Sequence, residues 1–90
     1  MIYIATDEHG KGVRHVTSFH NRLEFLNYAY EVLATNARNY MIRRRASSID
    51  TICEALDDSG IGFGARHHFR ISRKDAKKYL KNGVNFYINY

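Results

Sequence analysis

The chain has 90 residues, of which 44% are hydrophobic, with one cysteine, no proline and a formal net charge of +5. This length suits a single domain over residues 1–90 with one modest core, and the apolar content excludes a disordered protein. The lone Cys53 excludes an internal disulfide, and the apolar runs are shorter than the roughly 18 residues of a membrane-spanning helix, so we expect a cytoplasmic protein without membrane contact.

The N-terminal part predicts a hairpin followed by a long helix. Residues 2–5 have the composition of a strand, residues 7–12 that of a turn, and residues 13–16 that of a returning strand. A helix is expected over residues 21–42, because apolar residues recur there at spacings of three and four. They are Leu23, Leu26, Tyr30, Leu33, Ala37 and Tyr40 or Met41. We expect this stripe in the core, with a homodimer face as the alternative.

The C-terminal part predicts two more helices and two strands. Residues 49–56 and 73–81 have helical patterns, and residues 65–71 and 84–90 alternate as strands do. The expected helix caps are Ser18 or Asn21 for the first helix, Ser47 with Asp50 for the second, and Ser72 with Asp75 for the third. The predicted fold is therefore α+β: two layers, with a mainly antiparallel sheet and two or three helices packed on one face.

Positive charge is concentrated in the C-terminal part. Residues 1–37 contain three Lys and Arg against four Asp and Glu, whereas residues 38–90 contain eleven against five. Lys and Arg that bind phosphates release condensed counterions, which favours a polyanionic partner. We expect RNA before DNA, because no helix shows the polar, base-reading face of a helix-turn-helix element.

The candidate site is a groove between the strand at residues 65–71 and the helix that follows. Its expected phosphate ligands are Arg66, His68 and Arg70 on one strand face, and Arg73, Lys74, Lys77, Lys78 and Lys81 on the helix. Tyr87 and Phe63 are expected to stack exposed bases. A second contact would come from Arg43, Arg44 and Arg45. The alternatives are a solvated basic surface and, for the three adjacent arginines, a helix end whose dipole they complement.

A glycine-rich segment at residues 60–64 lacks the Gly-Lys-Ser/Thr ending of a P-loop, so we interpret it as a flexible turn. Gly62-Phe63-Gly64 before a strand, together with Ile2-Tyr3-Ile4, resembles fragments of the two signature strands of an RNA-recognition motif. The strand, helix and strand that follow resemble the second half of that fold. The resemblance is confined to these segments and implies a fold only.

No cofactor or metal is expected, because the histidines have no zinc-ligand spacing with Cys53. An enzyme is not favoured. A metal-independent ribonuclease needs a base, an acid and a cation that binds the phosphate. The base could be His68, the acid His15 or His20, and the cation Arg66, but no sequence pattern places these residues together.

The sequence therefore predicts a small basic regulator that binds RNA, with the ribonuclease as one alternative. Another is a phage or mobile-element inhibitor, or antitoxin-like protein, that binds a host nuclease or other nucleic-acid enzyme. This alternative depends on the seven tyrosines and the arginines, since both residue types are enriched where proteins bind one another.

Overall fold

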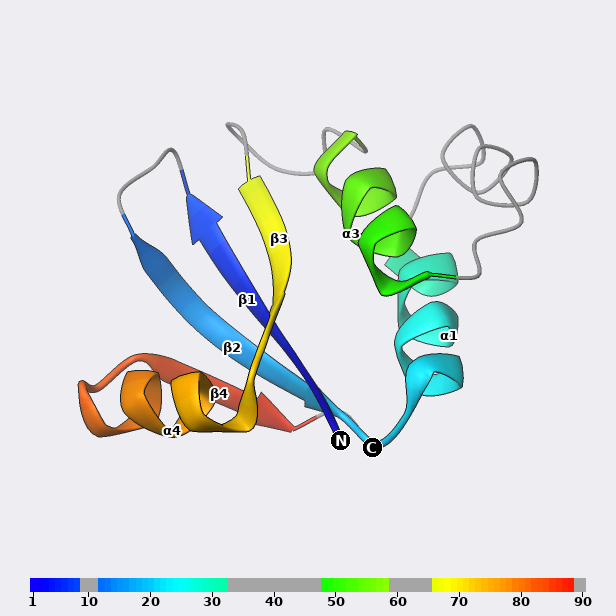
Figure 1. Ribbon diagram of the computed structural model, residues 1–90. Helices are drawn as coiled ribbons and strands as arrows, with labels where there is room; N and C mark the ends of the chain where they lie inside the picture. Colours follow the sequence, from blue (N-terminus) through cyan, green and yellow to red (C-terminus); the bar gives the residue numbers. More distant parts are fainter. Residues whose placement is uncertain (9–11, 33–47, 59–65, 89–90) are drawn as a thin grey trace.

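The computed structural model describes residues 1–8, 12–32, 48–58 and 66–88. The elements in chain order are β1 (Ile2–Glu8), β2 (Val13–Phe19), α1 (Arg22–Val32), α3 (Ile49–Asp58), β3 (Arg66–Ile71), α4 (Arg73–Lys81) and β4 (Asn85–Ile88), shown in Figure 1. This order confirms the predicted elements. The helix expected over residues 21–42 is described from Arg22 to Val32, and residues 33–42 lie outside the described ranges. Among the helices described, none has the length and apolar character to cross a membrane.

The four strands form one sheet in the order β3-β1-β2-β4. β1 is antiparallel to both of its neighbours, β2 and β3, while β4 runs parallel to β2. The β1–β2 pairing continues to Asp7, which the sequence predicts in a turn, and its register shifts between Thr6 and Asp7. The sheet is therefore mainly antiparallel, as predicted, with one parallel edge strand.

Apolar side chains cover both faces of this sheet. Ile2 and Ile4 belong to a core cluster with residues of α1 and α3, whereas Ala5 belongs to a second cluster with Ala76 of α4. Successive side chains of a strand point to opposite faces. The α+β class is confirmed, with α1 and α3 together on one face, but α4 lies against the other face (Figure 1). The second face of the sheet is also apolar, and α4 covers it as a third layer that the predicted two-layer arrangement lacks.

Side-chain caps fix the starts of the three helices. The Ser72 hydroxyl accepts a hydrogen bond from the Asp75 amide at 3.1 Å, as predicted for α4. For α1 the cap is Asn21, whose Oδ1 accepts from the Glu24 amide at 2.9 Å. The other candidate, Ser18, is buried in β2 and cannot serve. For α3 the cap is Ser48, which accepts from the Thr51 amide at 3.1 Å, while the expected Ser47 lies outside the described residues.

The buried side of α1 differs from the predicted stripe. Phe25 and Ala29 are fully buried, and the Phe25 ring lies 4.9 Å from the Phe19 ring of β2, centroid to centroid. Leu26 is only partly buried and Leu23 is 63% exposed. Leu33 lies outside the described residues. Because Phe25 packs on Phe19, Phe25 is buried against the sheet, and Leu23 and Leu26 are not.

Cys53 of α3 is buried, with 4% of its surface exposed. Burial raises the pKa of its thiol to about 12, and the neighbouring carboxylates of Asp57, Asp50 and Glu54 add to this rise. The thiol therefore remains protonated at neutral pH and packs as a small apolar side chain, as predicted.

Candidate nucleic-acid interface

Helix α4 presents five cations to solvent. The residues of this α4 basic face are Arg73, Lys74, Lys77, Lys78 and Lys81, and all five are exposed. At 3.6 residues per turn they fall within an arc of about 140°, opposite the buried Ala76. None of them forms an ion pair with an acid in the described part of the chain.

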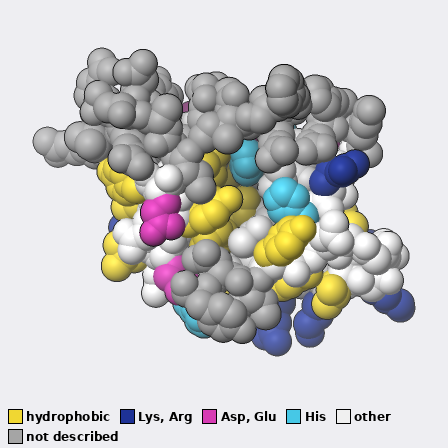
Figure 2. All heavy atoms as spheres, turned by 180° about the vertical axis from the view of Figure 1, so that it is seen from behind, with side chains coloured by type: hydrophobic (Ala, Val, Ile, Leu, Met, Phe, Trp, Pro, Cys, Tyr) yellow, Lys and Arg dark blue, Asp and Glu magenta, His cyan; other side chains and the backbone are white. Residues whose placement is uncertain are grey.

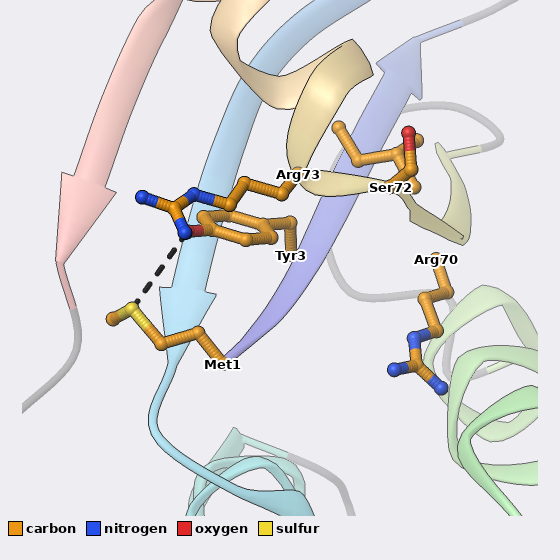
Figure 3. A pocket seen from close by; sticks show the side chains of 6 residues that line it. Met1, Tyr3, Arg70, Ser72 and Arg73 are labelled. Atoms are coloured by element: carbon orange, nitrogen blue, oxygen red, sulfur yellow. Dashed lines mark hydrogen bonds between the residues drawn. The ribbon is translucent and has the colours of Figure 1, made fainter.

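An open depression adjoins the start of this face, between the end of β3 and the first residues of β1. It has a volume of about 580 Å³. Its lining residues are Met1, Tyr3, Arg70, Ile71, Ser72 and Arg73. In Figure 3 the Arg73 side chain extends along the Tyr3 ring, while the Arg70 side chain points away from both. Arg73 thus belongs to both the depression and the α4 basic face.

Tyr3 is the residue of this region that sequence reasoning missed. Its ring is half-buried and lies 6.2 Å from the Phe86 ring, and its hydroxyl donates to the Met1 sulfur at 3.7 Å. It reaches the depression because β1 pairs with β3, which sets Tyr3 opposite Ile71. Nothing in the sequence spacing of residues 3 and 71 signals that pairing.

The predicted groove between β3 and α4 does not form as one surface. His68 lies opposite Thr6 in the sheet and bonds to α3, so it lies on the α1 and α3 side, whereas α4 covers the other face. The His68 side chain is only 17% exposed and its Nδ1 bonds to Asp57, so a ligand could meet only its Nε2, on the face of the sheet away from α4. Arg70 is exposed and is one of the residues that line the depression, but it lies opposite Ile4 in the sheet, so its side chain is on the same face as His68.

Several other predicted site residues are not tested. Arg66 begins β3, but its side chain lies outside what the structure describes. Phe63 and the arginine run at residues 43–45 lie outside the described ranges altogether.

Tyr87 of β4 is 54% exposed and pairs with Thr17, with its ring edge against His15 at 5.4 Å between centroids. It therefore lies on the side of the sheet away from α4.

Asp57, near the end of α3, holds the two adjacent histidines of β3. Its Oδ1 accepts hydrogen bonds from the backbone amide and the Nδ1 of His68, both at 2.7 Å. Its Oδ2 lies 3.0 Å from the Nδ1 of His67. The carboxylate thereby ties α3 to β3 and fixes the orientation of the His68 ring.

Two histidines flank Thr6 on the side of the sheet that faces α1 and α3. Thr6 pairs with His15 on one side and with His68 on the other, so the three residues form a row across the sheet. Both histidines line a small cavity of about 10 Å³ beneath α1 and α3. In the view from behind, histidine and hydrophobic side chains occupy the middle of the surface, and most Lys and Arg lie toward the lower and right edges (Figure 2).

In the ranges that the structure describes, no group of three or more His, Cys, Asp or Glu residues is arranged to hold a metal ion. No known protein family, curated protein or solved structure matches this chain. The resemblance to fragments of the RNA-recognition motif therefore receives no support from comparison with known families.

Proposed function

We propose that this protein is a small RNA-binding regulator whose α4 basic face contacts the phosphate backbone. The observation that carries the proposal is the arrangement of charge on α4. Arg73 and Lys77, Lys74 and Lys78, and Lys77 and Lys81 are like charges four residues apart. Such pairs lie side by side on a helix and each costs a few tenths of a kcal/mol.

A helix that only needs solubility can avoid this cost, because a surface of mixed charge is equally soluble. Asp75 is the one acid of α4, and in the described part of the chain it forms no ion pair with any of the five cations. A polyanion that binds along the helix removes the repulsion and releases counterions. The 12 Å that separate the ends of the helix, at about 1.5 Å per residue, give room for several consecutive phosphates.

Salt dependence tests the proposal. For a fluorescein-labelled single-stranded RNA, a site with about four phosphate contacts should give a log-log slope of affinity against salt near −3. Fluorescence anisotropy at several salt concentrations measures this slope. An affinity that does not change with salt would contradict phosphate binding and would favour the alternative of a protein partner.

A second candidate function is metal-independent RNA cleavage, which the row of His15, Thr6 and His68 favours. Each histidine is a cross-strand neighbour of Thr6, and such neighbours lie about 5 Å apart at their Cα atoms. The Cα atoms of His15 and His68 are therefore about 10 Å apart, a spacing from which the two rings can reach opposite sides of one phosphate. When the Nδ1 of His68 donates to Asp57, its Nε2 is the acceptor that a general base needs. The cavity between the histidines has room for about one water, so the phosphate would bind at its rim.

In this reaction His68 takes the proton of the ribose 2′-hydroxyl, whose oxygen attacks the phosphorus, and His15 gives a proton to the 5′-oxygen that leaves. The products are a 2′,3′-cyclic phosphate and a 5′-hydroxyl. We expect cleavage of RNA in the presence of EDTA, none of a 2′-deoxy analogue, and loss of activity of about 100-fold or more in His15→Ala or His68→Ala. His20→Ala is the control, since His20 bonds to Glu24 away from this row. Equal activity in all three variants would exclude His15 and His68 as the catalytic pair, and an inactive parent would contradict cleavage itself.

A further inference from the structure

The depression at the start of α4 has the size and lining of a nucleotide subsite. Its volume of about 580 Å³ falls within the range of about 300–1,000 Å³ typical of small-ligand pockets. Tyr3 and Arg73 are among its lining residues, and the Arg73 side chain lies along the Tyr3 ring (Figure 3). A base stacks on an aromatic ring, and a guanidinium pairs with phosphate oxygens.

Tyr3 is held in place before any ligand arrives. Its backbone pairs with Ser18 on one side and with Ile71 on the other, so it sits inside the sheet and not on a loop. The ring packs against Phe86 and its hydroxyl bonds to Met1, which restricts the side chain further. Because little rotational freedom remains to be lost, stacking on this ring retains most of its free energy.

The two arginines approach the depression from different elements. Arg70 comes from the end of β3 and Arg73 from the first turn of α4, and in Figure 3 the Arg73 side chain lies beside Tyr3 whereas the Arg70 side chain points away from both. Neither forms an ion pair with a described acid. The Ser72 hydroxyl accepts a hydrogen bond from the Asp75 amide as a helix cap, so the Arg73 guanidinium is the charged donor beside Tyr3.

We propose that this depression binds one unpaired nucleotide of a single-stranded RNA, with its base on Tyr3 and its phosphate held by Arg73. The inference rests on the proposed function, because Arg73 continues into the α4 basic face and the strand would run on along that face. A base inside a duplex is stacked between its neighbours and cannot reach Tyr3. The subsite therefore distinguishes single-stranded from double-stranded RNA.

The test compares two probes, a fluorescein-labelled single-stranded RNA octamer and the same octamer in a duplex. Tyr3→Leu should weaken binding of the single strand about tenfold, the loss expected for one stacked base, and leave duplex binding within twofold. Tyr3→Phe keeps the ring and should retain the affinity of the parent. Tyr87→Leu removes an exposed tyrosine on the other side of the sheet and serves as the matched control.

Tyr3 also packs on the second core cluster, so the folded state of each variant is checked by thermal melting followed by circular dichroism. A measurement on the parent protein does not depend on folding of a variant: an octamer without bases should bind about tenfold more weakly than the normal octamer at equal salt. Equal affinity for these two octamers overturns the subsite, as does an equal loss of single-strand and duplex binding in folded Tyr3→Leu. If that result comes with a steep salt slope, the α4 basic face still binds RNA and only the subsite is rejected.

Discussion

Replacement of Lys74, Lys77, Lys78 and Lys81 by Gln is expected to weaken binding of single-stranded RNA about 100-fold or more at moderate salt. Each phosphate contact is worth roughly 1 kcal/mol under these conditions, and four contacts are removed together. Gln has nearly the helix propensity of Lys, and the repulsion between like charges is relieved. We therefore expect the variant to melt at the same temperature as the parent or higher. Fluorescence anisotropy and a thermal melt measure the two effects.

A comparison at equal net charge separates this surface from a general effect of charge. Lys77→Gln with Lys81→Gln removes two charges from α4, and Arg14→Gln with Arg22→Gln removes two exposed charges elsewhere. The first pair should lose about tenfold in affinity and the second less than twofold, if both are folded. Equal losses from the two pairs would mean that only the net charge matters, and the α4 basic face would have to be abandoned as the site.

Phe25→Ala is expected to destabilise the domain by about 3–5 kcal/mol, a large part of the roughly 5–15 kcal/mol that such domains have in total. Phe25 is fully buried against Phe19, so the truncation leaves a cavity between α1 and the sheet. Leu23→Ala on the same helix should cost less than about 0.5 kcal/mol, because that side chain is 63% exposed. Urea unfolding followed by circular dichroism measures both. A larger cost for Leu23 than for Phe25 would restore the leucine stripe that the sequence predicts.

The order of the elements could be predicted because each depends on a local signal. Period-two alternation marks β3 and β4, and the Ser72 cap with Gly83 after the helix marks both ends of α4. The side of the sheet that each helix covers is not a local property. Ala5 and Val16 are apolar and lie on the face opposite to Ile4, which indicates that this face must also be covered. It does not indicate which helix covers it.

The candidate site was predictable in part for the same reason. Helical spacing was enough to group the cations of α4, whereas Tyr3 joins Arg73 only through the pairing of β1 with β3. That pairing joins residues nearly seventy positions apart, and its register depends on the whole sheet. His68 was assigned to a ligand surface because alternation identifies a shared face but not the helix that packs on it. The His68 ring instead forms a hydrogen bond with the carboxylate of Asp57.

The bond between Asp57 and the His68 amide also bears on how copies of this chain meet one another. β3 is an outer strand of the sheet, and an outward-facing amide is a template on which a strand of another molecule can add. Here the carboxylate already occupies that donor, and α3 stands alongside it. β4, the other outer strand, pairs only with β2 in the described part of the chain. Intermolecular strand addition, and aggregation that starts from it, is therefore expected at β4 and not at β3.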